Sequence, residues 1–478
     1  MLAVPPDIRP DLAERYRQLR PFDEAEMALV EALVARPDRL SRPHEVILRR
    51  ALNLARLWIV PGDAGDVVVG PQLSAFRDVV KRVADSIRDR TDLDPQSLAA
   101  DADALEPALR REQASLLSQT LGRLSPTALE REISTKSLVL AVGGGGGCGY
   151  VHLGAFSLLE SLGIRPKLVA GSSIGSILGL FRARDMDFRE STVTAVTSQL
   201  TFSSMFRVLD AETRYAMPGA LRLYLRTALA RYFESPQGGT MRLNELSVPF
   251  ICTVTGVRRE AVRQVRHYEK LFRKELRRGA LGRLLHVKDL VTNIVAFLSE
   301  LVATPGAMRA VSLGSDELTR DFDVIDAVGF SSALPAIIQY DVTRDDPRMH
   351  DLMRQVLEHN DVDFLADGGI AANVPARSAW EYVQAGHIGT RNVAVLGLDC
   401  FAPQIGRNMI FLPLMRLAAD NVNKDRAFAN LMFTYRKTLS PTSLVPRAGA
   451  LQQALRNGKE ELSEKGPLLQ KLLEVAAL

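Results

Sequence analysis

The sequence predicts an α/β fold with a mostly parallel, doubly wound sheet. From about residue 135 onward, short apolar runs alternate with helical patterns, the order of a sheet whose strands are joined by helices. These runs are apolar throughout and do not alternate with polar residues, as expected of strands buried on both faces. With 478 residues, 46% of them hydrophobic, the chain can bury a large core around such a sheet.

Residues 1–134 are expected to form a helical N-terminal extension. Apolar residues recur at helical spacing among arginines in this region; they are Val46, Ala51, Leu54 and Trp58. The pair Pro61-Gly62 is predicted to end that helix. We find no catalytic motif here and interpret the extension as a segment that packs on the main body or on another subunit, so a homo-oligomer could form through its helices.

Residues 135–410 are expected to hold the sheet and the chemistry, and residues 411–478 to form a helical C-terminal segment. Strands are predicted at 137–142, 167–170, 249–254 and 392–398. A helical pattern that ends at Gly163 separates the first two strands, and a second helix is predicted after Gly175.

A helical cap insertion is expected at about residues 258–302. Its first part is rich in basic side chains, namely Arg258, Arg259, Arg263, Arg266, Lys270, Arg273, Lys274, Arg277, Arg278, Arg283 and Lys288. Apolar residues recur there at steps of three and four: Val262, Val265, Tyr268, Phe272 and Leu276. The pattern predicts an amphipathic basic helix. It either packs on the core with a solvated charged face or forms a cap that faces a lipid surface or a partner.

Charge, cysteine content and hydropathy indicate which partners and which cellular location to expect. The net charge is +4, a mild excess that favours anionic partners without identifying one. Prolines and acids occupy the place of a secretory signal's apolar core, and no apolar run reaches the roughly 18 to 20 residues of a membrane-spanning helix. Cys148, Cys252 and Cys400 lack metal-site spacing and are odd in number. We expect a cytoplasmic protein with peripheral membrane contact and no nucleic-acid partner.

A candidate nucleophile lies in the segment Gly171-Ser172-Ser173-Ile174-Gly175, which has the pattern G-x-S-x-G. The segment falls directly between a predicted strand and a predicted helix. In that context a sharp turn exposes the serine at the helix N-terminus, and the flanking glycines let the neighbouring backbone come close. The helix dipole there favours a developing anion. Ser173 is therefore the candidate nucleophile.

A glycine-rich run at residues 143–149 follows the first predicted strand and opens the next helix. Such a loop directs backbone N–H groups into one pocket, which suits a phosphate or an oxyanion. Gly144, Gly146 and Gly149 match the dinucleotide pattern G-x-G-x-x-G, but the next strand ends without the acidic residue that binds a ribose hydroxyl. No Lys-Ser or Lys-Thr follows, which argues against a Walker loop. An oxyanion hole beside Ser173 fits this loop better.

A candidate general base lies in Asp367-Gly368-Gly369, where two glycines would let the aspartate face the serine from a loop. A Ser-His-Asp enzyme of the usual hydrolase order has its histidine after the acid, and only His387 follows Asp367. We expect His387 to lie in a solvent-facing loop and His152 to be packed in the core. A dyad in which Asp367 takes the proton from Ser173 needs neither histidine, provided that the carboxylate is desolvated.

Together these segments resemble those of the patatin-like phospholipases. The resemblance covers roughly residues 136 to 400 and includes the glycine loop and elbow, the segment Ser331-Ser332-Ala333-Leu334-Pro335 and the block DGGIAANVP. It implies a three-layer α/β/α fold, Ser173 as nucleophile and Asp367 as general base, with no metal or other cofactor. The implied oxyanion loop contains Gly144, Gly145, Gly146, Gly147 and Gly149, and the supporting motif glycines are Gly171, Gly175, Gly368 and Gly369.

The sequence differs from the family pattern at Cys148, where the family commonly has Arg or Lys. A cation at this position would help to hold the loop and to stabilise negative charge. Its loss leaves room for a weakened or regulated enzyme, and we expect Cys148→Arg to keep or raise activity.

The resemblance leads us to expect a serine lipid acyl hydrolase of the phospholipase A or lysophospholipase type. Its expected partners are a phospholipid or another lipid ester and an anionic membrane surface. Two alternatives remain open. One is an acyl-binding or regulatory protein of the same fold with weak or lost turnover. The other is a different use of the same serine, as an acyltransferase or within a Ser-His-Asp esterase.

Overall fold

The structure is a computed structural model that describes residues 10–89, 93–120, 122–207, 213–264, 287–402 and 412–477. Its centre is a seven-stranded sheet in the order β10-β7-β4-β3-β11-β12, with β8 on the other edge of β7. The five parallel strands are β3 (Ser137–Val142), β4 (Pro166–Ser172), β7 (Phe250–Val257), β11 (Val393–Asp399) and β12 (Leu431–Thr434). Two strands run antiparallel to β7: β8 (Met308–Leu313) and β10 (Phe364–Ala366). The predicted mostly parallel sheet is confirmed.

Helices cover both faces of this sheet, so the predicted three-layer α/β/α fold is confirmed. Along β3, Leu140 and Val142 pack into one hydrophobic cluster, whereas Val139 and Ala141 pack into another on the opposite face. Helices on the first face are α6 (Val151–Ser161), α7 (Ile174–Arg184), α15 (Val324–Ser331) and α19 (Ala448–Ser463). The second face is covered by α17 (Ala376–Gln384) and by the first turns of α1.

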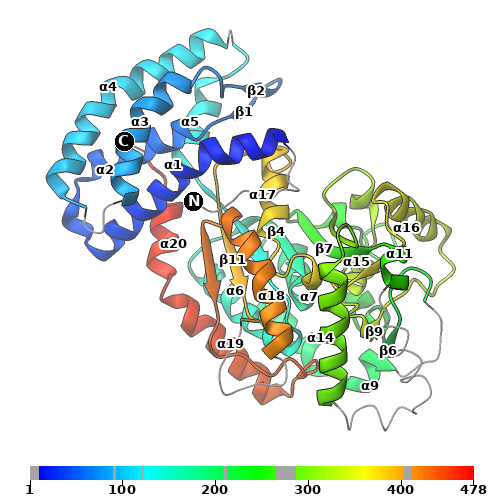
Figure 1. Cartoon of the computed structure of the whole chain (residues 1–478). Helices are drawn as coiled ribbons and strands as arrows, with labels where there is room; N and C mark the ends of the chain where they lie inside the picture. Colours follow the sequence, from blue (N-terminus) through cyan, green and yellow to red (C-terminus); the bar gives the residue numbers. More distant parts are fainter. Residues whose placement is uncertain are drawn as a thin grey trace.

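The N-terminal helices gather at one end of the molecule, coloured blue to cyan in Figure 1. They are α1 (Pro10–Ala35), α2 (Arg42–Ala55), α3 (Ser74–Asp89), α4 (Pro95–Gln119) and α5 (Pro126–Ser134). Their apolar faces share a hydrophobic core of their own. One expectation about this region is wrong, because the helix before Pro61-Gly62 ends at Ala55. The hairpin β1 (Ile59–Gly62) and β2 (Gly65–Val68) follows, and Gly65 takes a φ of 119° beside its turn.

The N-terminal helices pack directly on the main body. The Tyr16 hydroxyl donates a hydrogen bond to the Ala427 carbonyl at 2.7 Å. The buried Glu26 carboxylate lies 2.9 Å from the Lys136 ammonium, which immediately precedes β3. The last helix, α20 (Gly466–Leu473), returns to this region, where its Leu472 carbonyl accepts from the Arg49 guanidinium at 2.8 Å. The chain therefore ends beside its own N-terminal helices (Figure 1).

The C-terminal segment, expected to be helical, contains α18 (Leu412–Asp425), α19 and α20 but also supplies the edge strand β12. The boundary predicted at residue 410 therefore does not follow the sheet. Helix α19 packs very closely on α6. A Cβ atom on Gly458 would lie 1.9 Å from the Val151 carbonyl oxygen, so only glycine permits this approach.

The insertion begins with α11 (Arg259–Gln264) and ends with α14 (Val287–Ala303). Residues 265–286 lie outside the described residues, including most of the predicted amphipathic stripe and Arg266, Arg273, Arg277 and Arg278. Of the described cations, Arg258 forms an ion pair with Asp361, and Arg259 lies 3.7 Å from Asp363. These two arginines thus contact the segment that precedes β10.

Smaller elements complete the body beside the sheet. A second sheet is formed by β5 (Phe206–Arg207), β6 (Gly219–Leu223) and β9 (Ala336–Gln339). Within the described residues, the α-helices not yet named are α8 (Glu190–Gln199), α9 (Phe202–Met205), α10 (Leu225–Leu229) and α16 (Pro347–His359). Along the described chain, no helix is both long and apolar enough to cross a lipid bilayer.

Candidate active site

Strand β7 brings the ends of two other strands together. On one edge, β7 pairs with β8 from Cys252 to Val257. On the other edge, β4 runs parallel to β7 and ends with Ser172 opposite Thr253, while β10 runs antiparallel and ends with Ala366 opposite Thr255. The two strands therefore approach each other head to head along one edge. The residues that follow them, Ser173 and Asp367, meet there.

Ser173 sits in a strained turn between β4 and α7. Its φ of 53° and ψ of −130° lie in a region that side chains with a Cβ rarely adopt. The flanking glycines make the turn possible. A Cβ on Gly171 would lie 2.6 Å from the Ser176 Cα, and one on Gly175 would lie 2.3 Å from the Val142 carbonyl oxygen. The G-x-S-x-G pattern therefore corresponds to the tight elbow that the sequence predicts.

Asp367 accepts two hydrogen bonds. The Ser173 Oγ donates to its Oδ2 at 2.7 Å, and the Gly369 N–H donates to its Oδ1 at 2.8 Å. Burial raises the pKa of the Asp367 carboxyl to about 6, although both hydrogen bonds act in the opposite direction. Gly368 lets this loop lie against β7, because a Cβ there would be 2.0 Å from the Thr253 carbonyl oxygen.

Ser331 links the turn that contains Ser173 to the sheet. Its Oγ accepts a hydrogen bond from the Ser173 N–H at 2.9 Å and donates one to the Thr253 carbonyl at 2.6 Å. Two residues later, the Ala333 carbonyl accepts from the Asp367 N–H at 2.9 Å. The end of α15 therefore holds the backbone of both Ser173 and Asp367. Sequence reasoning gave Ser331 no role, although it belongs to the small-residue segment already singled out.

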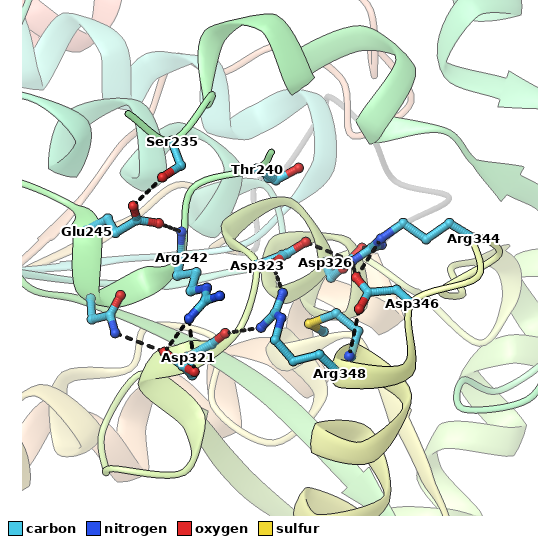
Figure 2. A network of polar contacts seen from close by, with 12 residues as sticks. Ser235, Thr240, Arg242, Glu245, Asp321, Asp323, Asp326, Arg344, Asp346 and Arg348 are labelled. Atoms are coloured by element: carbon cyan, nitrogen blue, oxygen red, sulfur yellow. Dashed lines mark hydrogen bonds and ion pairs between the residues drawn. The ribbon is translucent and has the colours of Figure 1, made fainter. Parts of the chain in front are cut away.

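The other end of α15 is fixed by a network of ion pairs. Figure 2 shows Asp323 and Asp326, at the start of the helix, with Arg344 and Arg348 around them. The Arg344 guanidinium lies 2.7 Å from the Asp323 carboxylate and 2.8 Å from that of Asp326. Both aspartates are buried, and Arg226 also pairs with each of them. The helix whose C-terminal end contacts the backbone of Ser173 and Asp367 is thus held at both ends.

The glycine loop has two members that face the cavity. Gly145 and Gly146, with φ values of 147° and 56°, line the cavity beside Ser173. The Gly144 N–H instead donates to the Asn373 carbonyl at 3.2 Å, and the Gly147 N–H to the Pro441 carbonyl at 2.9 Å.

Gly149 serves packing, because a Cβ there would be 2.5 Å from a methyl of Ile174. The N–H groups of Gly144 and Gly147 already have carbonyl partners. Of the five glycines predicted for the oxyanion loop, the described part of the cavity wall therefore includes only Gly145 and Gly146.

Neither histidine considered at the sequence level lines this cavity. His152 is fully buried, its Nε2 lies 3.0 Å from the Gly143 carbonyl oxygen, and burial lowers the pKa of its ring to about 4. His387 is exposed, and its ring stacks near that of Tyr382, with centroids 4.4 Å apart. Among the described residues, Asp367 is the side chain to which the Ser173 hydroxyl donates a hydrogen bond.

Cys148 is not part of the cavity wall in the described structure. Its side chain is fully buried, and its Sγ donates to the Leu439 carbonyl at 3.1 Å. Burial raises the pKa of this thiol to about 12, so it stays neutral. A buried position against the C-terminal segment has no solvent for an arginine head group. Cys252 and Cys400 are also buried, as expected.

The cavity over Ser173 has a volume of about 250 Å³ and a largely apolar wall. Within the described residues, Asp367 is its only Asp, Glu, Lys or Arg. In the same part of the chain, no group of three or more His, Cys, Asp or Glu side chains is placed to hold a metal ion. The site therefore combines a hydroxyl, a desolvated carboxylate and a glycine loop at the base of an apolar chamber.

Comparison with known proteins shows which family the sequence matches. The sequence profile of the patatin-like phospholipases matches residues 140–380, about half of the chain. Lysophospholipase NTE1 of Coccidioides immitis is 44% identical over 59 residues, which cover 12% of this chain and 4% of that protein. Patatin-like phospholipase domain-containing protein 6 of Mus musculus is 27% identical over 139 residues, 28% of this chain and 10% of that protein.

A third relative, lysophospholipase NTE1 of Candida glabrata, is 28% identical over 140 residues, 29% of this chain and 8% of that protein. In these three relatives the aligned region thus spans a tenth or less of their own length.

Proposed function

This chain belongs to the patatin-like phospholipase family, and from that premise we propose that it is a serine lipid acyl hydrolase of the phospholipase A or lysophospholipase type. The observation that carries the proposal is the 2.7 Å hydrogen bond from the Ser173 hydroxyl to the desolvated Asp367 carboxylate at the base of an apolar cavity. The hydroxyl and the carboxylate supply a nucleophile and a base, and the cavity suits a hydrocarbon chain.

In the proposed acylation step, Asp367 accepts the proton of the Ser173 hydroxyl while Oγ attacks the ester carbonyl carbon. The carbonyl oxygen becomes an oxyanion that accepts hydrogen bonds from the N–H groups of Gly145 and Gly146. When the tetrahedral intermediate collapses, the bond to the alcohol oxygen breaks. Asp367 returns its proton to that leaving oxygen, and the acyl group remains esterified to Ser173.

In the proposed deacylation step, Asp367 takes a proton from water, and the resulting hydroxide attacks the acyl carbon. The Ser173 Oγ then leaves and regains its proton from Asp367, which releases a fatty acid. A carboxyl with an ordinary pKa near 4 would be a weak base for either step. Its desolvation in this site, which raises the pKa to about 6, makes it a better proton acceptor near neutral pH.

The lipid head group would lie outside the cavity, since the described wall offers no cation to bind a phosphate. Phospholipids, lysophospholipids and other lipid esters therefore all remain within the proposal. An anionic membrane surface is the proposed source of substrate, reached by peripheral binding. An acyltransferase would use the same first step, with an alcohol in place of water as the acceptor of the acyl group.

Variants at the two reactive residues test the proposal. We expect Ser173→Ala and Asp367→Asn each to reduce hydrolysis of p-nitrophenyl esters and of lysophospholipid micelles by roughly 10⁴-fold, and the double variant to be little worse. Ser172→Ala is the matched control, because this neighbouring serine is buried and its Oγ makes no hydrogen bond within the described chain. Near-normal turnover in Asp367→Asn would show that Asp367 is not the general base. A histidine would then become the candidate for that role.

A further inference from the structure

The cavity follows one face of the helix that begins at the nucleophile. Ser173 is the residue before the first turn of α7. Four α7 side chains line the cavity at steps of three and four residues: Ile174, Ile177, Leu178 and Phe181. Such spacing keeps side chains on a single helix face. The chamber therefore extends from Ser173 along the axis of α7.

Phe181 is the most distant of these residues from the nucleophile. It lies eight positions after Ser173, which at the rise of an α-helix corresponds to about 12 Å along the axis. Side chains of α8 and α10, such as Val196 and Leu229, also contribute apolar surface to the cavity wall. A straight acyl chain attached at Ser173 would thus run along α7 towards Phe181.

Phe181 packs against a second buried aromatic side chain. Its ring makes an edge-to-face contact with the ring of Phe233, with centroids 5.1 Å apart. Phe233 has no exposed surface, and the Arg184 guanidinium lies 5.8 Å from its ring centroid. Phe181 lines the cavity and Phe233 lies outside its described wall, so a chain that reaches Phe181 would meet a buried aromatic pair that it could not displace without loss of packing.

We propose that Phe181 sets the length of the acyl chain that the site accepts, by contacting the methyl end of a chain esterified to Ser173. This inference rests on the proposed function. Chains that end before Phe181 gain affinity with each methylene that they bury. Chains that would extend past it must bend back or leave methylenes in water, and they gain nothing more.

Substitutions that change the size of this side chain test the inference. The measurement is kcat/KM for p-nitrophenyl esters from butyrate to stearate. Phe181→Ala should move the optimum to longer chains, with a gain of roughly fourfold for each further methylene that becomes buried. Phe181→Trp should move the optimum to shorter chains. Phe181→Leu, a milder change, supports the same comparison should the alanine variant fail to fold.

Leu180→Ala is the matched control. Leu180 is a fully buried neighbour in α7, but it is not part of the cavity wall in the described chain. Its truncation should lower stability and leave the order of preference among the esters unchanged. A second readout avoids turnover, namely the rate at which alkyl fluorophosphonates of graded length label Ser173. The optimum should shift in the same direction there.

Two failures can be told apart. If Ser173 is labelled and the esters are hydrolysed, yet the chain-length optimum is the same in wild type, Phe181→Leu and Phe181→Trp, then the role of Phe181 is overturned and the hydrolase stands. If the wild-type protein hydrolyses no ester and Ser173 resists the fluorophosphonates, then the proposed function is overturned, and this inference with it.

Discussion

Ser173 and Asp367 are 194 positions apart in the sequence, yet the serine Oγ lies 2.7 Å from the aspartate Oδ2. The pairing register of β7 explains this proximity. Strand β4 ends opposite Thr253 and strand β10 ends opposite Thr255, so the next residue of each strand faces the same short stretch of β7. Because β7 belongs to the buried sheet, the distance between the two side chains is held by backbone pairing.

The difference in stability between Asp367→Asn and wild type should depend on pH. Folding raises the pKa of the Asp367 carboxyl from an unfolded value of about 3.9 to about 6. The contribution of this group to stability is therefore fully present below about pH 4 and is lost as the pH rises through about 6. A shift of about two pKa units corresponds to about 3 kcal/mol at neutral pH.

Asparagine has no charge to desolvate, so the variant should be more stable than wild type at pH 8 by up to about 3 kcal/mol. The difference should shrink at pH 4.5, where much of the wild-type carboxyl is already protonated. Urea unfolding of both proteins at the two pH values gives the comparison. A difference that is the same at both pH values would show that the carboxyl is not shifted.

Ser331→Ala should lower turnover without changing substrate affinity. The alanine leaves the Ser173 N–H and the Thr253 carbonyl without their partner, which frees the elbow to move. A displaced nucleophile should reduce kcat by roughly 10- to 100-fold, with KM unchanged. Steady-state kinetics on a soluble ester would show this split.

Loss of two buried hydrogen bonds also lowers stability by about 1–3 kcal/mol. The control is therefore Val80→Ala, a truncation in the core of the N-terminal helices that lowers stability away from the site. Its kcat should stay at the wild-type value. Equal losses of kcat in both variants would mean that Ser331 acts only through stability.

Cys148→Arg should destabilise the protein, contrary to the expectation drawn from the family pattern. The Cys148 side chain is fully buried against the Leu439 carbonyl, so arginine would bring both excess volume and an unsolvated charge. We expect a loss of about 3 kcal/mol or more. Cys148→Ala should cost about 1 kcal/mol. Thermal unfolding of both variants tests this, and an arginine variant as stable as wild type would place residue 148 in contact with solvent.

The sequence alone predicted the parts of the site that depend on local geometry. Strand, turn and helix around Ser173 follow from an apolar run, two glycines and a helical pattern within about 40 residues. The glycines at 171 and 175 are required by backbone contacts that nearby residues make. Such contacts leave a signature in composition and spacing, which explains why the elbow and the glycine loop were recognised.

Features that depend on contacts between residues far apart in the sequence could not be predicted in this way. The antiparallel strands β8 and β10 pair with β7 across 50 or more residues, and β12 lies in a segment that otherwise forms helices. The role of Ser331, at the end of α15, depends on its contacts with Ser173, in the turn after β4, and with Thr253 on β7. The positions of the two histidines, by contrast, were predicted correctly, because His152 is buried and His387 is exposed.

The most direct test of the account is the pH dependence of covalent labelling at Ser173. A short-chain fluorophosphonate is added at pH values from 4.5 to 9, and intact-protein mass spectrometry measures the rate of modification. If Asp367 is the base, the wild-type rate should rise with a midpoint near pH 6, the pKa of its carboxyl. Asp367→Asn should react far more slowly and without that midpoint. A rise near pH 6 that persists in Asp367→Asn, or modification of a different residue, would contradict the Ser173–Asp367 dyad.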